Sequence, residues 1–255
     1  METVYMQFFL TVNEGKWLIA RAVAGMERVQ RALRSGKVIL KGGTTVSCIS
    51  ELLVGYPLKI SGRMTPEGAM PNRTYTEQAY GILIENGQIR GIDAEVDTLM
   101  PDMGPGDVAI AGANLFDVHG GAAILAGSPG GFRWGRATAA MISEGADVII
   151  PMGLEKLIPG SVNEAMKTAR RQGIRYHDGM ACGLFPLVGD IVTEIEAVKL
   201  LADVEPCVIG RGGIQGAEGG TLFQVSGPEA EVERLREIVS LCKNQKIGGD
   251  PASLQ

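Results

Sequence analysis

The residues best suited to chemistry begin at Lys41, directly before the turn Gly42-Gly43-Thr44-Thr45. Two glycines allow a tight turn, and a threonine at a helix start can cap free backbone N–H groups with its hydroxyl. The same N–H groups, together with the positive end of the helix dipole, form a site for phosphate or carboxylate. The segment therefore predicts an anion site, with an ordinary capped strand-to-helix turn as the alternative.

A second glycine-rich segment, 112–121, combines a carboxylate and an imidazole. His119 could donate a proton or hold a ligand oxygen, although a structural hydrogen bond within the loop is an equal alternative. Asp117 could bind a sugar hydroxyl, and capping of the loop's own N–H groups competes with that role. We take both as candidate catalytic residues, and the adjoining Gly120 and Gly121 as candidate ligand contacts.

Two further segments are rich in glycine. Gly130 and Gly131 precede a predicted helix start at which Arg133 and the nearby Arg136 could grip an anion, or form a solvated surface pair instead. The densest stretch, 210–220, does not fit a dinucleotide fingerprint, because the strand-like segment 221–225 follows where a helix would be needed. We predict a mobile connection there, whose Glu218 could reach a site.

Alternating strands and helices must position these loops. The apolar run 38–40 fits a strand buried on both faces, the apolar residues of 46–53 have helical spacing, and 107–111 and 148–150 repeat the strand pattern. We therefore predict an α/β fold with a mostly parallel sheet and helices on both faces. Ligands bind such sheets at the C-terminal ends of the strands, where the first three glycine loops would meet. Helices are also expected at 13–35, from the glycine-rich segment 127–136 up to 142, and at 162–172. A strand is expected at 122–126.

The remaining segments give the expected domain organisation. Asn86-Gly87 predicts a hairpin over 80–92 that decorates the sheet, a strand is expected at 57–60, and 61–76 is expected to be a long loop that could cover a site. After residue 189, the pattern helix 194–201, strands 207–209 and 221–225, and helix 229–242 predicts a small α+β unit. The predicted division is a ligand-binding domain at 1–188, the small unit at 189–246, and a tail at 247–255 that is disordered from 248.

The bulk composition limits the partners. The chain has 255 residues, a net charge of -5 and no block of Lys and Arg, so we predict no nucleic-acid or membrane partner. We also predict no metal or cofactor. The four cysteines are scattered without a C-x-x-C pair and are expected to be buried thiols. The opening residues do not read as a signal peptide and no segment is long enough to span a membrane, so we expect a cytoplasmic location.

Four segments, in order, resemble the superfamily of ribose-5-phosphate isomerase type A, glucosamine-6-phosphate deaminase, CoA transferases and the sugar-phosphate-sensing domain of DeoR-type repressors. The turn at 42–45 resembles their phosphate loop, and 112–121 has the spacing of their Gly-Ala-Asp-x-x-Asp-x-x-Gly-Gly. Segment 149–157 resembles a strand and loop that carry the family lysine, and 183–188 resembles the isomerase segment that leads into a ferredoxin-like subdomain. The resemblance covers roughly residues 37–243.

The resemblance implies a Rossmann-like domain with a ferredoxin-like C-terminal subdomain, and a sugar-phosphate site that includes Asn114 and Lys156. The isomerase's catalytic aspartate falls on Asn114, whose amide cannot act as a general base, and its base glutamate has no counterpart. We therefore expect a small anionic metabolite, phosphorylated or carboxylated, bound by a non-isomerase enzyme or a sensor.

A second hypothesis from the same resemblance is acyl-CoA transferase or hydrolase chemistry. The CoA transferases of the superfamily use a glutamate nucleophile, and Glu218 is the candidate here. Members of the superfamily are commonly oligomeric, and the apolar, charge-poor start at 4–12 could supply an interface. We therefore expect a homo-oligomer.

Overall fold

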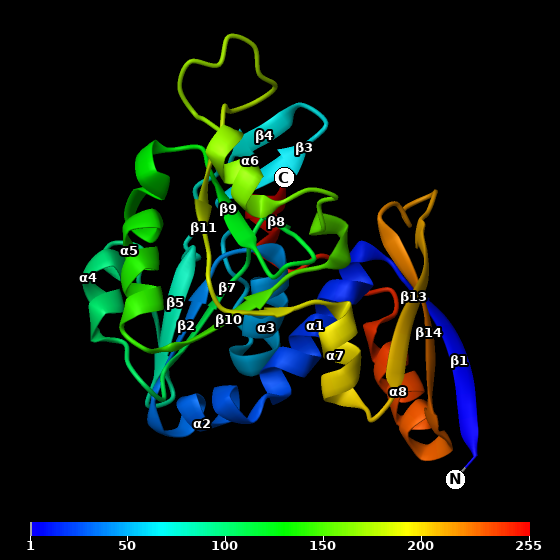
Figure 1. Ribbon diagram of the computed structural model, residues 1–255. Helices are drawn as coiled ribbons and strands as arrows, with labels where there is room; N and C mark the ends of the chain where they lie inside the picture. The colour runs from blue at the N-terminus through cyan, green and yellow to red at the C-terminus, as the bar shows by residue number, and fades with distance from the viewer. Residues whose placement is uncertain (1) are drawn as a thin grey trace.

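The computed structural model describes residues 2–255, which are built around a mixed six-stranded sheet (Figure 1). The strands lie in the order β12-β10-β7-β2-β5-β6, of which β12, β10, β7 and β2 pair in parallel, while β5 runs antiparallel to both of its neighbours. The predicted α/β class is confirmed. The strand bounds are β2 Lys37–Lys41, β5 Gly81–Glu85, β6 Gln88–Gly91, β7 Val108–Ala111, β10 Asp147–Pro151 and β12 Asp190–Val192.

The core lies between this sheet and the helices around it. Val38, Ile39 and Leu40 of β2 and all four residues of β7 are fully buried, as expected for central strands that are covered on both faces. Figure 1 shows α4 and α5 on one side of the sheet and α1 and α3 on the other. The helix bounds in this part are α1 Val12–Gly25, α2 Glu27–Ser35, α3 Thr44–Val54, α4 Val96–Leu99, α5 Phe132–Ser143 and α6 Val162–Thr168.

The first helical region differs from the prediction in two respects. We expected Asn13, the first residue of the predicted helix, to cap it, but Thr11 caps α1. The Thr11 hydroxyl accepts from the Glu14 N–H while the Glu14 carboxylate accepts from the Thr11 N–H in a capping box. The single helix expected over 13–35 is divided into α1 and α2, because Met26 has extended backbone angles (φ -60°, ψ 133°). Helix α6 is likewise shorter than expected and ends at Thr168.

A second sheet carries the C-terminal elements. It has the order β1-β14-β13, with β1 Thr3–Leu10, β13 Glu205–Gly212 and β14 Gly220–Pro228, and α7 Glu194–Leu201 and α8 Glu229–Cys242 belong to the same region. The two helices have the predicted bounds. The strands extend into the stretch predicted as a mobile connection, leaving 213–219 as the tip of a hairpin. Strand β1 pairs with β14 along its whole length, so the N-terminal residues join this sheet.

The C-terminal tail is packed against the main body, in contrast to the disorder expected from its composition. Ser253 is fully buried and its hydroxyl accepts from the Ile60 N–H at 3.1 Å, while the Asp250 N–H donates to the Leu58 carbonyl at 2.9 Å. These contacts occupy the backbone of segment 57–60, which was expected to be a strand and forms none. A short 3-10 helix, Pro251–Leu254, ends the tail.

Two predicted connections form regular structure. Asn86 and Gly87 both have positive φ (51° and 73°), as a tight hairpin turn requires, but β5 pairs with β2 and so is part of the main sheet rather than a decoration. The expected long loop 61–76 contains a hairpin of β3 Gly62–Thr65 and β4 Gly68–Pro71. A further sheet has the order β11-β9-β8, with β8 Leu115–Phe116, β9 Ala122–Ala126 and β11 Gly183–Pro186.

Within residues 2–255, no helix combines the length and apolar character needed to cross a membrane.

Candidate anion-binding site

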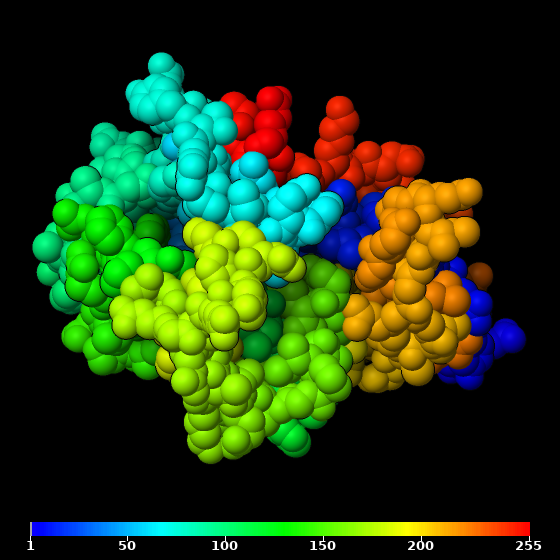
Figure 2. All heavy atoms as spheres, turned by 90° about the horizontal axis from the view of Figure 1, so that it is seen from above, coloured from blue at the N-terminus to red at the C-terminus, as the bar shows by residue number. Residues whose placement is uncertain are grey.

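A cavity of about 610 Å³ lies at the C-terminal ends of β2, β7 and β10. The turn after β2, segment 112–114 after β7 and Pro151 of β10 all contribute to its wall, so the structure places a cavity at the edge of the sheet that the sequence indicates. The β3–β4 hairpin lines another side. Figure 2 looks onto this region, where the hairpin (cyan) lies against the segment near Met180 (yellow-green), whose N–H donates to the Ala69 carbonyl.

The N-terminus of α3 opens into this cavity. Gly43 is its N-cap residue, and no side chain caps the helix. The N–H groups of Thr44, Thr45 and Val46 lack an acceptor within residues 2–255, because a helix provides none for its first turn. The Thr45 side chain is only 2% exposed and its hydroxyl has no hydrogen-bond partner in the same range. The turn is therefore open to a ligand, and the capping role considered for its threonines is not observed.

The two glycines of the turn have different roles. A Cβ on Gly42 would lie 2.3 Å from the Tyr80 carbonyl oxygen and 2.8 Å from the Lys59 carbonyl oxygen, so the backbone passes too close for any side chain. Gly43 has an extended backbone (φ 172°, ψ 151°), and a Cβ there would meet no heavy atom within 4 Å. Gly42, and not Gly43, is therefore the residue of the turn that must be glycine.

Three lysines from distant parts of the chain line the cavity. Lys16 comes from α1, Lys41 ends β2, and Lys156 belongs to the 3-10 turn Leu154–Lys156 after β10. Lys16 is 7% exposed, and its ammonium donates to the Asn13 side-chain carbonyl at 3.3 Å. The Lys156 ammonium donates to the Ala113 carbonyl at 3.0 Å. None of the three forms an ion pair with a carboxylate in the described part of the chain.

Burial makes the charged form of these lysines unfavourable. It lowers the pKa of Lys16 and of Lys156 below the usual range of a lysine. Burial, followed by the positive charge of Lys156, lowers the pKa of Lys41 to about 8. The charges of Glu155 and Glu194 offset this effect in part for Lys16 and Lys156, but neither carboxylate forms an ion pair with a lysine of the cavity. Cations that are partly or fully buried without an ion-pair partner are stabilised when an anion binds among them. The electrostatics and the open helix terminus thus favour the same class of ligand.

The second glycine segment does not contribute its charged residues to the cavity. Asp117 is 5% exposed, and its carboxylate accepts from the N–H groups of His119 (2.9 Å), Gly121 (3.0 Å) and Val162 (2.7 Å). The bond from Val162 is the largest cause of a lowered pKa of Asp117. Asp117 therefore holds its own loop and the start of α6, which was the alternative to a catalytic role. His119 is exposed, and His119, Gly120 and Gly121 lie outside the cavity wall.

The third segment is also directed elsewhere. Arg133 and Arg136 both bind the Asp97 carboxylate of α4, at 2.7 Å and 2.9 Å, so they form a surface cluster rather than an anion site. Gly130 and Gly131 have positive φ at the start of α5 and do not line the cavity. These four residues are close together in the sequence, but none of them lies in the cavity wall.

Two predicted residues remain, and they lie in different places. Asn114 lines the cavity, and its side-chain carbonyl accepts from the Leu125 N–H at 3.0 Å. Glu218 is exposed at the tip of the β13–β14 hairpin, where its carboxylate accepts from the Gly216 N–H, and it does not contribute to the wall. The cavity thus contains Lys41, Gly42, Gly43, Thr44, Thr45, Asn114 and Lys156 from the predicted set.

Two cationic residues of the wall were missed by the sequence reasoning. Lys16 lies on a helix whose packing against α3 brings it to the cavity, and Arg63 lies on the unpredicted β3–β4 hairpin. The Arg63 guanidinium donates to the backbone carbonyls of Ser253 and Gln255 in the tail. No local pattern marks either residue, because both reach the site through contacts distant in the sequence.

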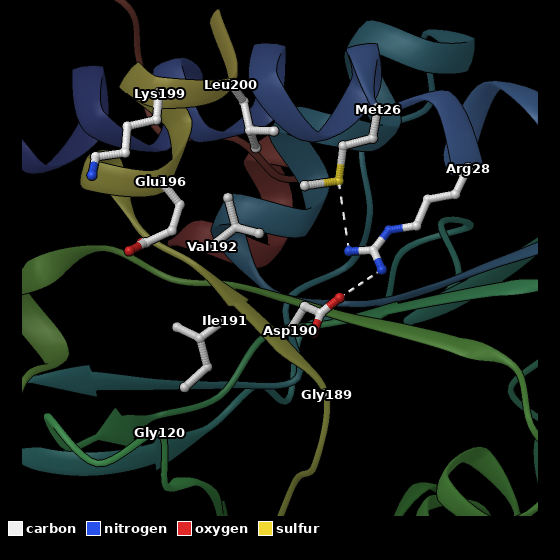
Figure 3. Close-up of a pocket in the computed structure, with 10 residues that line it drawn as sticks. All are labelled: Met26, Arg28, Gly120, Gly189, Asp190, Ile191, Val192, Glu196, Lys199 and Leu200. Carbon is white, nitrogen blue, oxygen red and sulfur yellow. Dashed lines mark hydrogen bonds and ion pairs between the residues drawn. The ribbon is translucent and has the colours of Figure 1, made fainter. Parts of the chain in front are cut away.

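A second cavity, of about 530 Å³, lies between α2, β12 and α7. Its charged residues are already engaged. The Arg28 guanidinium binds the Asp190 carboxylate at 2.6 Å, as Figure 3 shows, and the Glu196 carboxylate accepts from the Thr193 N–H at the start of α7. Most of the remaining wall is aliphatic. This cavity therefore offers a charged ligand fewer free charged groups than the lysine-lined cavity does.

A buried carboxylate lies behind the lysine-lined cavity. Glu194, at the start of α7, is 4% exposed, and its carboxylate accepts from the Leu154 N–H at 2.8 Å, next to the turn that carries Lys156. Burial, followed by the neighbouring charge of Glu155, raises the pKa of Glu194 to about 7. Because an unfolded glutamate has a pKa near 4.5, the folded protein retains a proton that the unfolded chain releases between these values.

The stability of the protein should therefore fall as the pH rises from about 4.5 to about 7 on account of this group. Glu194→Gln should remove that part of the pH dependence and make the variant more stable than the parent at pH 8, because glutamine keeps an acceptor for the Leu154 N–H without a charge. Chemical denaturation at several pH values measures this. Glu205→Gln, at an exposed carboxylate, is the control. An unchanged pH dependence in Glu194→Gln would contradict the assignment.

Comparison of the chain with known protein families, with curated proteins and with solved structures found no match.

Proposed function

We propose that this protein binds a small phosphorylated or carboxylated metabolite, of the sugar-phosphate kind, in the lysine-lined cavity. The observation that carries the proposal is the placement of three lysines, without a carboxylate partner among residues 2–255, around the uncapped N-terminus of α3. Either chemistry on the ligand or sensing of it would use the same binding site.

The groups on the cavity wall define how the anion would be held. The N–H groups of Thr44, Thr45 and Val46 supply neutral donors, and the helix dipole adds a favourable field. Lys16 and Lys156 supply charge-assisted hydrogen bonds from the other side. A tetrahedral or planar oxyanion has enough acceptor oxygens to engage several of these donors at once.

The size and remaining wall of the cavity support a ligand larger than inorganic phosphate. A volume of about 610 Å³ falls within the roughly 300–1,000 Å³ of ordinary small-molecule sites. Ile124, Leu125 and Met180 provide apolar surface, and Asn114 provides an amide. A carbon chain of a few atoms with hydroxyl groups and one anionic end would match this combination of surfaces.

We also propose that the resemblance to the superfamily includes this binding site. The turn at 42–45, Asn114 and Lys156, which belong to three of its four motifs, line one cavity, and the order α7-β13-β14-α8 is the one expected for a ferredoxin-like unit. Because Asp117, Gly120 and Gly121 lie outside the cavity wall, the second motif contributes only its first residues. Glu218 lies outside it as well, so no specific contact favours the acyl-CoA hypothesis.

Thermal unfolding with ligand panels tests the proposal. We expect stabilisation by phosphorylated sugars, because a ligand at 100 times its dissociation constant adds about 2.7 kcal/mol of apparent stability. The same sugars without phosphate should give little stabilisation. Stabilisation by CoA esters alone, with turnover of those esters that Glu218→Gln abolishes, would instead favour acyl chemistry, and an absence of stabilisation by any anion would contradict anion binding.

A further inference from the structure

Lys41 differs from the two other lysines of the cavity in its contacts. The ammonium groups of Lys16 and Lys156 each donate to a carbonyl oxygen, at 3.3 Å and 3.0 Å. The Lys41 nitrogen donates to no acceptor in the described range, and it lies 5.8 Å from the centroid of the Trp134 ring, a contact that weakly favours the ammonium form. Because no hydrogen bond holds this nitrogen, it is free to approach a ligand in the cavity that Lys41 lines. Its neutral amine can act as a nucleophile.

The surroundings of Lys41 favour its neutral amine form. Burial is the larger cause of its lowered pKa and the positive charge of Lys156 the second. With a pKa of about 8, roughly a tenth of the Lys41 side chains are neutral at pH 7, about 300 times the fraction in a lysine of pKa 10.5. Desolvation beside another cation is a recognised way to make a lysine amine nucleophilic at neutral pH.

We propose that Lys41 forms an imine with the carbonyl group of an aldehyde or ketone that carries a phosphate or carboxylate group. This inference rests on the proposed function, since the helix terminus, Lys16 and Lys156 hold the anionic end of the ligand. Lys41 ends β2, directly before the turn that forms the helix terminus, so anion and amine share one cavity wall. The substrate class is thereby narrowed from anionic metabolites to anionic carbonyl compounds of a few carbon atoms.

The reaction needs no other reactant. The neutral Lys41 nitrogen attacks the carbonyl carbon, which forms a C–N bond and moves the C–O π electrons onto oxygen. Proton transfer from nitrogen to oxygen gives a neutral carbinolamine. Protonation of its hydroxyl then allows the C–O bond to break, water leaves, and a protonated imine remains. The Lys156 ammonium is the cationic neighbour available to supply that proton. When the iminium loses its proton to the Lys156 amine, the Lys156 ammonium is regenerated.

Reductive trapping tests the proposal. The full-length protein is treated with glyceraldehyde 3-phosphate and sodium borohydride, and the modified lysine is located by peptide mass spectrometry. We expect a stable secondary amine on Lys41, with the extent of trapping rising with pH around an apparent pKa of about 8. Glycerol 3-phosphate, which has no carbonyl group, should compete with the reaction, and unphosphorylated glyceraldehyde should react far less.

Two lysines serve as controls. Lys41→Arg keeps a cation but has no amine nucleophile, so it should lose the trapped product. Lys59 is buried and lies over the Tyr80 ring, but it does not line the cavity and should remain unmodified. If Lys41→Arg does not fold, the site of modification, its pH dependence and the competition in the parent protein still decide the question.

The outcomes separate this inference from the proposed function. Binding of glycerol 3-phosphate without modification of Lys41 would overturn the imine and leave anion binding intact. Modification of Lys59 and exposed lysines to the same extent as Lys41 would also overturn it. If glycerol 3-phosphate does not bind and Lys41 is not modified, both proposals fail. Modification of Lys41 that glycerol 3-phosphate suppresses would support both.

Discussion

Replacing Gly42 with alanine is expected to destabilise the protein severely, whereas the same change at Gly43 should leave the fold nearly unchanged. The Gly42 Cβ would collide with the carbonyl oxygens of Tyr80 and Lys59, which belong to the backbone and cannot rotate away. Overpacking typically costs about 1–3 kcal/mol, and a clash with two fixed backbone atoms should lie near or above the top of that range. Chemical denaturation of both variants measures the difference.

Gly43 provides the matched control at the adjacent position. Its extended backbone is accessible to any residue, and a Cβ there meets no heavy atom within 4 Å. Because Gly43 lines the cavity, Gly43→Val should fold but bind an anion less tightly. Equal losses of stability for Gly42→Ala and Gly43→Ala would contradict the described course of the backbone through this turn.

The second large effect is expected at Lys156. Lys156→Ala should weaken binding of a phosphorylated ligand by roughly ten- to a hundredfold, because the loss of a charge-assisted hydrogen bond costs about 1.5–3 kcal/mol. The fold should be retained, since the variant removes a partly buried charge whose lowered pKa indicates that folding disfavours it. Isothermal titration calorimetry measures the affinity.

Lys167→Ala is the matched control for this prediction. Lys167 is exposed and pairs with Glu164 on the same helix, away from the cavity wall, so its removal should not change the affinity. Lys156→Ala should also raise the pKa of Lys41, because it removes the neighbouring positive charge. Unchanged affinity in Lys156→Ala would show that the ligand does not contact this lysine.

The sequence could predict the elements whose signals are local. Helices α7 and α8 have the expected bounds, and Asn86-Gly87 identified a hairpin, because periodicity and turn chemistry are properties of neighbouring residues. The packing of residues 248–255 could not be predicted in this way. Its composition resembles that of a mobile tail, and its order depends on hydrogen bonds to segment 58–60, nearly two hundred residues away.

The same distinction applies to the site. The turn at 42–45 was identified because glycine and threonine before a helix have a direct physical meaning. Asp117 and Arg133 were candidates on equally good residue types, but their partners, the Val162 N–H and Asp97, lie 45 and 36 residues away. Lys16 was missed for the converse reason, since only the packing of α1 on α3 brings it to the cavity. Residue type identified candidates, and tertiary contacts selected among them.

The binding of an anion at the N-terminus of α3 is tested most directly by amide chemical shifts during a titration with glycerol 3-phosphate. We expect the backbone N–H resonances of Thr44, Thr45 and Val46 to move and saturate together, since these are the free donors that face the cavity. The resonances around the second cavity, at Arg28 and Asp190, should not move. Saturable shifts confined to that second region, or no saturable shift at Thr44–Val46, would contradict the proposed site.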